Sequence, residues 1–234
     1  MPIEHIKKFI SYLVQDRKIS SSYQNISVNA IKFYYEKILG WPHTDIKLNR
    51  PRKERHLPEV LTRNEVISMI SSIINLKHKF VLILLYSTGL RRGELLDLKL
   101  GDIDRENMQI WVRGGKGKKD RYVQLGNNTL KVMDEYIKLY NPQEYLIEGR
   151  GDRYSASSVI EIINDAERKA GISKRITPHK FRHSDATHLL EDGVDIRFIQ
   201  ELLGHSSIKT TQIYSHVTDR NIKRIINPFD KMEI

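Results

Sequence analysis

Near the N-terminus, apolar and polar residues recur with the period of an α-helix. The apolar positions fall into two sets, Ile3, Ile6, Ile10, Leu13 and Val14, and then Ile31, Tyr34, Tyr35 and Ile38. Residues spaced three or four apart lie on one face of a helix, so each set predicts an amphipathic helix. We expect two such helices, the second of which ends at the Gly-Trp-Pro sequence of residues 40–42.

A basic stretch separates this part from the rest of the chain. Residues 49–58 read NRPRKERHLP, which is rich in Arg and Lys, poor in apolar residues and bracketed by prolines. Such a composition is typical of an extended linker. The sequence therefore predicts a small helical domain at residues 1–48, a basic linker at 49–57 and a larger domain at 58–234.

The larger domain begins with a helical pattern that changes its period in the middle. The sequence Thr62-Arg-Asn-Glu65 has the form of a capping box at the start of a helix. The helical pattern continues to Gly89, gives way to alternation in MQIWV at 108–112 and RYVQL at 121–125, and then returns up to the C-terminus. We expect a mainly α-helical fold with one small antiparallel β-hairpin or sheet, in the α+β class.

Composition narrows the range of partners. The 234 residues carry a formal net charge of +10 and include no cysteine. A basic chain attracts nucleic acids or anionic lipid surfaces, and the lack of cysteine excludes disulfides, thiolate zinc sites and cysteine nucleophiles. The longest apolar segment, residues 80–86, is far too short to span a bilayer, so we expect a soluble, intracellular protein.

One arginine is predicted on the inward face of a helix that begins at Thr177-Pro178, with Thr as N-cap and Pro in the first turn. The inward stripe of this helix consists of His179, Arg182, Ala186, Leu189 and Leu190. Arginine is almost never fully buried without a partner. We therefore expect an acidic side chain or a bound phosphate to meet Arg182.

A second arginine is placed in a similar way. In the segment LLYSTGLRRGELLDL, Arg91 shares a helix face with Leu95 and Leu98, and Glu94 is near enough in sequence to pair with it. Each arginine by itself could be one half of a buried ion pair that joins two helices. Two of them favour an anion site, because two guanidinium groups can clamp the oxygens of one phosphate.

Two further segments add candidate chemistry. Residues 113–121, RGGKGKKDR, form the turn of the predicted hairpin and include Lys116, although they also fit a solvated basic loop. They lack the GxxxxGK[ST] spacing of a phosphate-binding loop, so no nucleotide hydrolysis is implied. Residues 202–216, LGHSSIKTTQIYSHV, contain His205 and Tyr214, and by themselves indicate only a helix end, a helix start and a packed tyrosine.

Four of these segments, in this order, resemble the tyrosine recombinase family, which comprises the integrases and the Xer-type recombinases. The segments are TGLRRGELLDL, GGKGKKDRYVQL, TPHKFRHSDATHLL and LGHSSIKTTQIYSHV. The resemblance extends from about residue 57 to the C-terminus. It implies the catalytic domain of that family, preceded by a short helical DNA-binding segment.

The resemblance implies a site-specific recombinase or integrase that cleaves and rejoins duplex DNA through a 3′-phosphotyrosyl intermediate, without a metal, ATP or any other cofactor. The catalytic residues that it implies are Arg91, Lys116, His179, Arg182, His205 and Tyr214. The two arginines would hold the scissile phosphate, Tyr214 would be the nucleophile, and Lys116 would protonate the leaving 5′-oxygen. His179 would assist proton transfer with the tyrosine, and His205 would hydrogen-bond the phosphate.

The implied partner is double-stranded DNA with inverted half-sites, on which four copies of the chain would assemble as a dimer of dimers. The tail at 215–234 has an amphipathic stretch with Ile222, Ile225 and Ile226. It would dock on a neighbouring subunit, and the alternative is that it packs on its own domain. The resemblance also implies a place in the cytoplasm of a prokaryotic cell, at the nucleoid, and no membrane partner.

Other residues near these motifs are interpreted as supports. By the family pattern His183 is a structural neighbour of the site and His188 is a packing residue. The alternative, a metal site built from such histidines, would also need carboxylates at ligand spacing near them. Glu94 and Asp97 are interpreted as residues that support the site without taking part in the chemistry. Glu94 would orient a neighbouring group or cap its helix. Asp185 is an unusual acidic residue beside the His-x-x-Arg segment, and the sequence offers no account of it.

The N-terminal part departs from the family pattern. Residues 1–48 are enough only for the later helices of the four-helix or larger domain that is usual there, so we interpret them as a partial, truncated core-binding domain. Two alternatives to a recombinase stay open. One is a nicking and resealing topoisomerase of type IB that works as a monomer, and the other is a truncated, non-catalytic DNA-binding relative.

Overall fold

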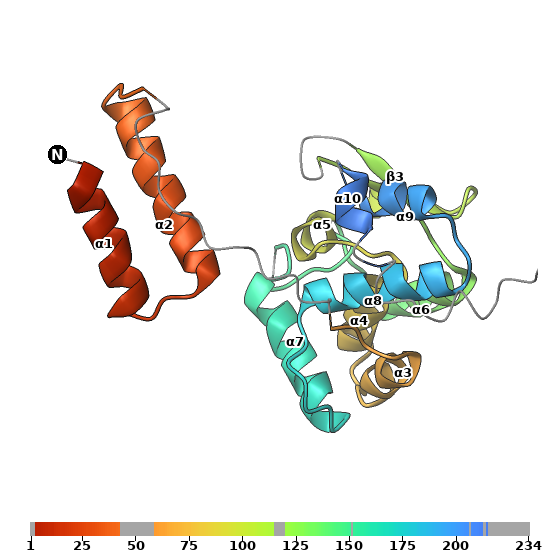
Figure 1. The fold of residues 1–234 in the computed structure, drawn as a ribbon. Helices are drawn as coiled ribbons and strands as arrows, with labels where there is room; N and C mark the ends of the chain where they lie inside the picture. Colours follow the sequence, from red (N-terminus) through yellow and green to blue (C-terminus); the bar gives the residue numbers. More distant parts are fainter. Residues whose placement is uncertain are drawn as a thin grey trace, which may run out of the picture. The chain divides into compact units, whose positions relative to one another are not determined.

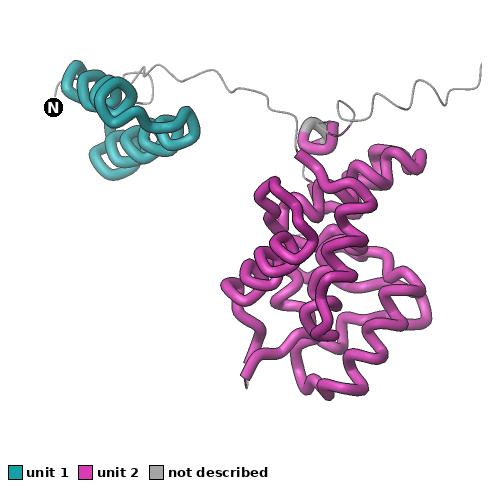
Figure 2. Tube along the Cα trace, turned by 90° about the horizontal axis from the view of Figure 1, so that it is seen from below, with its two compact units in different colours: residues 1–56 teal, residues 57–234 magenta. Residues whose placement is uncertain are grey.

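The computed structural model describes residues 3–42, 59–114, 120–150, 152–205, 207–212 and 214. The chain forms two compact units, residues 1–56 and 57–234 (Figure 2). Lys116, the predicted linker at 49–57 and the tail at 215–234 lie outside the described residues.

The first unit contains two helices, α1 (Ile3–Gln15) and α2 (Ser21–Phe33), and a π-helical turn, η1 (Tyr34–Ile38). The two helices lie side by side (Figure 1). Ile6 of α1 and Tyr35 of η1 are the buried residues of a small core between them. The two helices expected from the apolar periodicity are confirmed, whereas that periodicity gives no indication of the π-helical turn.

The second unit is mainly helical with a small sheet, which confirms the expected fold class. Its helices and helical turns are α3 (Arg63–Ser71), α4 (Leu76–Ser87), α5 (Arg92–Asp97), η2 (Leu100–Asp102), α6 (Asn127–Tyr140), α7 (Ala156–Lys169), α8 (Pro178–Glu191), α9 (Ile196–Leu203) and α10 (Ile208–Thr211). Its strands are β1 (Ile103–Asp104), β2 (Gln109–Val112) and β3 (Arg121–Gln124). In Figure 1, α8 crosses the middle of this unit, with α3 and α7 drawn below it and α5, α9 and α10 above.

Helix α4 is the centre of the core, since it packs against α3, α5, α6, α7 and α8. Its fully buried residues are Phe80, Val81, Leu82, Leu84 and Leu85. A helix with neighbours on every side needs apolar residues on every side, which explains the unbroken apolar run at 80–86. Within the described residues, no helix is both long enough and apolar enough to cross a membrane.

Capping residues determine where these helices begin. Thr62 closes the predicted capping box of α3, and Thr177 caps α8 with Pro178 in its first turn, also as predicted. The Asn75 side chain caps α4. The helical stretch expected up to Gly89 is therefore interrupted after α3 and consists of two helices.

The sheet is antiparallel, with the strand order β1-β2-β3. Ile110 and Val123 pair across β2 and β3 and point into the core, while the neighbouring pair, Trp111 and Tyr122, lies on the outer face with the rings stacked. Alternation along each strand produces this division into two faces. The strands β2 and β3 confirm the predicted hairpin, and β1 is too short to show a period in the sequence.

Candidate active site

Arg182 of α8 is buried, with 2% of its surface exposed. Its Nη1 donates a hydrogen bond to the carbonyl of Gly89, and its Nη2 donates to the carbonyl of Leu203. Two main-chain oxygens thus take the place of the expected acidic partner. Since neither carries a net charge, the guanidinium keeps its charge for a further anion; burial, with the charges of Arg91 and Arg121, lowers its pKa only to about 10.

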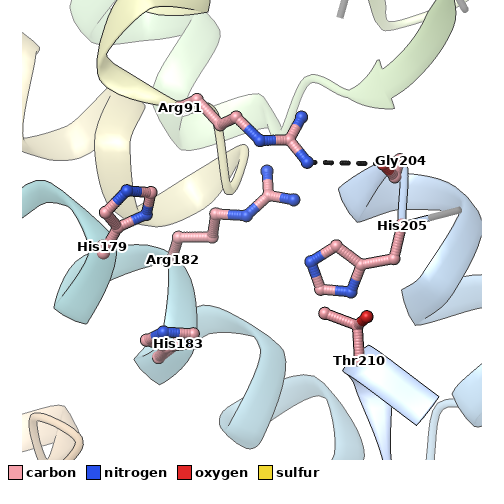
Figure 3. A pocket seen from close by; sticks show the side chains of 7 residues that line it. All are labelled: Arg91, His179, Arg182, His183, Gly204, His205 and Thr210. Atoms are coloured by element: carbon pink, nitrogen blue, oxygen red, sulfur yellow. Dashed lines mark hydrogen bonds between the residues drawn. The ribbon is translucent and has the colours of Figure 1, made fainter. Parts of the chain in front are cut away.

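Arg91 lies directly before α5 and next to Arg182 at the same pocket (Figure 3). Its Nη1 donates to a Glu94 carboxylate oxygen at 2.6 Å, and its Nη2 donates to the carbonyl of Gly204 at 3.3 Å. The Arg91 backbone amide donates to the other Glu94 oxygen at 2.8 Å, which caps the helix. The expected pairing of Arg91 with Glu94, and the capping role of Glu94, are confirmed.

A second arginine, Arg121 of β3, holds the same carboxylate. Its Nη1 and Nη2 donate to the two oxygens of Glu94 at 2.9 and 2.7 Å, and both side chains are less than a tenth exposed. Burial alone would raise the pKa of Glu94, but the hydrogen bonds from Arg121 and Arg91 outweigh it and lower the pKa to about 2. Arg121 is not among the residues predicted from the sequence, although alternation places it on the inward face with Val123.

His205 follows the end of α9, where Gly204 adopts a left-handed φ of +61° and closes the helix. The Nδ1 of His205 lies 3.0 Å from the hydroxyl of Thr211, which is buried. This contact fixes the ring on the side of the pocket opposite the arginines (Figure 3). Burial, with the charges of Arg182 and Arg91, lowers the pKa of His205 to about 4, so the ring is neutral near pH 7.

Tyr214 has no exposed surface and packs in an apolar cluster with residues of α8 and α9. Its hydroxyl oxygen lies 2.7 Å from Nδ1 of His183. Burial raises the pKa of Tyr214 to about 12, although the charge of Arg182 acts in the opposite direction. The phenol is therefore protonated, and its oxygen is held against an imidazole.

His179 and His183 lie one turn apart on α8, with ring centroids separated by 6.4 Å. Burial lowers the pKa of both rings, with help from the charge of Arg182, and that of His183 falls to about 4. The sequence predicted His183 only as a structural neighbour of the site, and its contact with the Tyr214 hydroxyl was not predicted. No spacing along the chain indicates it, because the two residues meet only in the folded unit.

These side chains surround a pocket of about 340 Å³. Its lining residues are Arg91, His179, Arg182, His183, Gly204, His205 and Thr210 (Figure 3). With two guanidinium groups and imidazoles that are neutral near pH 7, the lining carries net positive charge and matches an anion such as a phosphate group.

The structure thus brings Arg91, His179, Arg182 and His205, all predicted from the sequence, to the wall of one pocket. Tyr214 adjoins the pocket through His183. Lys116 is outside the described residues, and the catalytic role of each residue stays a prediction.

Two of the supporting residues lie away from the pocket. The Nδ1 of His188 is 2.8 Å from the hydroxyl of Tyr86, so this histidine packs inside the unit as expected. Asp97 forms an ion pair with Arg153 at the surface, where it supports the end of α5.

Asp185, one turn along α8 from Arg182, is a buried carboxyl group. Within the described part of the chain its Oδ2 has no hydrogen-bond partner. Burial raises the pKa of Asp185 to about 7. The carboxyl lies against Gly89, where a Cβ would come within 2.9 Å of Oδ2, so the missing side chain of that glycine makes room for it.

Comparison with protein families gives two matches that together span most of the chain. Residues 59–221 match the model described as phage integrase family, and residues 1–45 match the model described as phage integrase, N-terminal SAM-like domain.

Curated relatives are similar to this chain over most of its length. The chain is 39% identical over 224 residues to tyrosine recombinase XerA of Pyrococcus horikoshii, which covers 93% of this chain and 78% of the relative. It is 42% identical to tyrosine recombinase XerA of Thermococcus onnurineus, over 86% of this chain and 72% of that protein. It is 35% identical to tyrosine recombinase XerD of Oceanobacillus iheyensis, over 91% of this chain and 77% of that protein.

Solved structures agree with these matches. A crystal structure of XerA recombinase superposes with a TM-score of 0.66 at 31% identity and covers all of this chain and 85% of that one. The XerH site-specific recombinase bound to difH substrate superposes with a TM-score of 0.77 at 22% identity, over 96% of this chain and 70% of that one. At that identity the second match supports the fold alone.

Proposed function

Because the chain belongs to the phage integrase family, the family of the tyrosine recombinases, we propose that it is a site-specific recombinase. It cleaves and rejoins duplex DNA through a 3′-phosphotyrosyl intermediate, and it needs neither a metal ion nor ATP. The observation that carries the proposal is the pocket in which Arg91 and Arg182 stand together beside the buried hydroxyl of Tyr214.

The arginines bind the scissile phosphate. Their guanidinium groups hold the two non-bridging oxygens and stabilise the additional charge of the pentacoordinate transition state. Main-chain carbonyls fix Arg182, and Glu94 fixes Arg91, so both groups are oriented before DNA arrives. Preorganisation of this kind avoids a reorganisation cost during the reaction.

Tyr214 and Lys116 perform the exchange of bonds. A bond forms between the Tyr214 oxygen and phosphorus as the bond from phosphorus to the 5′-oxygen breaks, and Lys116 gives that oxygen a proton. A 5′-hydroxyl from the partner strand then attacks the phosphotyrosine and restores a diester, so the bond energy is conserved without ATP. His205 hydrogen-bonds the phosphate, and His179 lines the pocket where it helps to move the proton that leaves the tyrosine.

The side chain of Tyr214 is fully buried, and its hydroxyl contacts His183, a residue that lines the pocket.

The proposed partner is double-stranded DNA with inverted half-sites, on which four copies assemble, as recombination between two such sites requires. The SAM-like part at residues 1–45 and the basic sequence at 49–57 contact DNA beside the catalytic unit. The tail at 215–234 docks on a neighbouring copy. DNA complexes among the similar structures, such as the lambda integrase dimer bound to a COC′ core site, support a DNA partner.

Covalent capture of DNA tests the proposal. Wild type, Tyr214→Phe and Tyr145→Phe are incubated with nicked duplexes from the flanks of the protein's own gene and quenched in detergent. Wild type and the control Tyr145→Phe are expected to form a protein–DNA adduct with a 3′-phosphotyrosine, and Tyr214→Phe to form none.

Two other results would point elsewhere. DNA binding without an adduct, even on nicked substrates, would favour a non-catalytic DNA-binding relative. An adduct together with relaxation of supercoiled DNA by the monomer, with no pairing of two sites, would favour a type IB topoisomerase.

A further inference from the structure

The ring of His183 occupies a particular place between the nucleophile and the pocket. Its Nδ1 lies 2.7 Å from the Tyr214 hydroxyl, the oxygen that would attack phosphorus. The same side chain lines the pocket in which the phosphate would lie. The imidazole therefore touches both the reacting oxygen and the space that the substrate would fill.

The ring is also in the protonation state that a base requires. Burial, with the neighbouring His179 and the charge of Arg182, lowers the pKa of His183 to about 4. The imidazole is thus neutral near pH 7, with one nitrogen that carries a lone pair and one that carries a proton. The phenol of Tyr214 is protonated and can donate to that lone pair.

We propose that His183 is a catalytic residue, the direct proton acceptor for Tyr214, and that His179, one turn away on α8, assists this transfer from the wall of the pocket. As the tyrosine oxygen bonds to phosphorus and the 5′-oxygen leaves, the phenol proton passes to Nδ1 of His183. The same ring returns a proton to the phenol oxygen when the phosphotyrosine is resolved. This inference rests on the proposed function, because it concerns the activation of the nucleophile in that reaction.

A bound phosphate makes the ring of His183 a stronger base. Negative charge beside the ring favours the imidazolium and raises the pKa of His183 above its value in the empty pocket. The positive charge of Arg182 already favours the phenolate of Tyr214. A bound phosphate therefore strengthens His183 as a proton acceptor in the loaded site.

The inference differs from a purely structural role, in which the histidine only holds the tyrosine ring in place. An asparagine at 183 places an amide near the position of Nδ1 and keeps a hydrogen bond, but it is not a base. His183→Asn therefore separates the two roles. The matched control is His188→Asn, because His188 is on the same helix and contacts the hydroxyl of Tyr86 at 2.8 Å, away from the pocket.

The experiment measures the rate of adduct formation on nicked duplexes as a function of pH. For His183→Asn we expect DNA binding as in wild type, a rate near neutral pH that is lower by about 10²-fold, the usual effect of one general base, and a rate that keeps rising with pH as hydroxide replaces the base. His188→Asn is expected to retain the wild-type pH profile. A duplex with sulfur in place of the 5′-bridging oxygen, whose leaving group needs no acid, should retain the defect of His183→Asn.

Each outcome bears on the inference. A wild-type rate and pH profile in His183→Asn, or recovery of its rate with the sulfur-substituted duplex, would overturn the role as base. If wild type forms no adduct, or if Tyr214→Phe forms one, the proposed function fails first and the inference fails with it.

A measurement on the free protein tests the same point without catalysis. In ¹⁵N spectra of histidine-labelled protein near pH 7, we expect His183 as the neutral tautomer with the proton on Nε2 and Nδ1 free to accept. The His183→Asn variant assigns the resonance. A proton on Nδ1 would show that the ring donates to the tyrosine, which contradicts the inference.

Discussion

Glu94 links two of the arginines around the pocket. Its carboxylate accepts hydrogen bonds from the side chains of Arg91 and Arg121. It also accepts a hydrogen bond from the backbone amide of Arg91 and so caps the start of α5. A buried charge pair contributes little net stability compared with apolar residues, but the loss of one member leaves the other buried and unpaired. The carboxylate therefore holds both arginines in position, although it does not itself line the pocket.

Glu94→Gln should lower the free energy of unfolding by about 3–5 kcal/mol, since Arg121 loses its charge partner. Because the pKa of Glu94 is lowered from 4.5 to about 2, its contribution is present above the ordinary pKa and is lost as the pH falls towards 2. Urea denaturation near pH 7 measures the effect. The control is Glu144→Gln, whose exposed pair with Lys99 should contribute far less to stability than the buried pair of Glu94; equal losses in both variants would contradict the prediction.

Asp185 should make the stability of the protein depend on pH. Its pKa is raised from 3.8 to about 7, so the folded state favours the protonated carboxyl. That contribution is fully present below the unfolded pKa and is lost as the pH rises through 7.

Between about pH 5 and pH 8, wild type is expected to lose on the order of 2 kcal/mol more unfolding free energy than Asp185→Asn, since one pKa unit corresponds to about 1.4 kcal/mol. The difference between the two proteins separates Asp185 from the histidines that titrate in the same range. Glu106→Gln, at an exposed position, should behave as wild type. Parallel pH curves for wild type and Asp185→Asn would rule the idea out.

Residues that follow a motif or a period could be predicted, and residues that depend on tertiary contact could not. The inward stripe of α8 predicted a partner for Arg182 but not its nature, because main-chain carbonyls leave no trace in side-chain chemistry. Arg121 could have been predicted, because alternation in β3 places it on the inward face. The contact of His183 with Tyr214 depends on how α8 packs against the chain after α9, and one sequence does not specify that packing.

The turn between α4 and α5 supplies one of the two acceptors that orient Arg182 in the pocket. Gly89 has a φ of +56°, presents its carbonyl to Arg182 and leads directly to Arg91. A Cβ at this position would lie 2.9 Å from both the Asp185 carboxyl and a methyl group of Leu203. The turn therefore needs glycine for its backbone conformation and for the space around it.

Gly89→Ala should destabilise the protein by on the order of 1–3 kcal/mol, through strain at positive φ and the two close contacts. Gly93→Ala is the matched control, because Gly93 lies in α5, a Cβ added there would have no neighbouring atom within 4 Å, and alanine favours a helix. It should stabilise the protein slightly. Thermal unfolding compares the two, and a neutral effect at Gly89 would contradict the prediction.

At this scale, long elements were predictable and short ones were not. The periodicity predicted the first two helices, and the capping residues predicted the starts of α3 and α8. The division between α3 and α4 was missed because apolar residues continue across it. The two residues of β1 are held by pairing with β2, and such pairing has no local pattern.

On the scale of the whole molecule, charge is the dominant property. The net charge of +10 gives the chain a long-range attraction to polyanions, and the pocket is positive as well. Phosphate contacts release counterions from DNA, so affinity should fall as salt rises. Fluorescence anisotropy with a labelled duplex should give a linear plot of log affinity against log salt, with a slope of about −0.9 for each phosphate that the protein neutralises. An affinity that does not change with salt would contradict this expectation.

The two acceptors of Arg182 come from distant parts of the sequence, at residues 89 and 203. During synthesis on the ribosome, the arginine and its first acceptor are made before the second. A nascent chain thus carries the guanidinium without the clamp that orients it, and the pocket is completed only after residue 203 has been made and has folded into place. A chain that stops before residue 203 would therefore lack one of the two acceptors that orient this arginine.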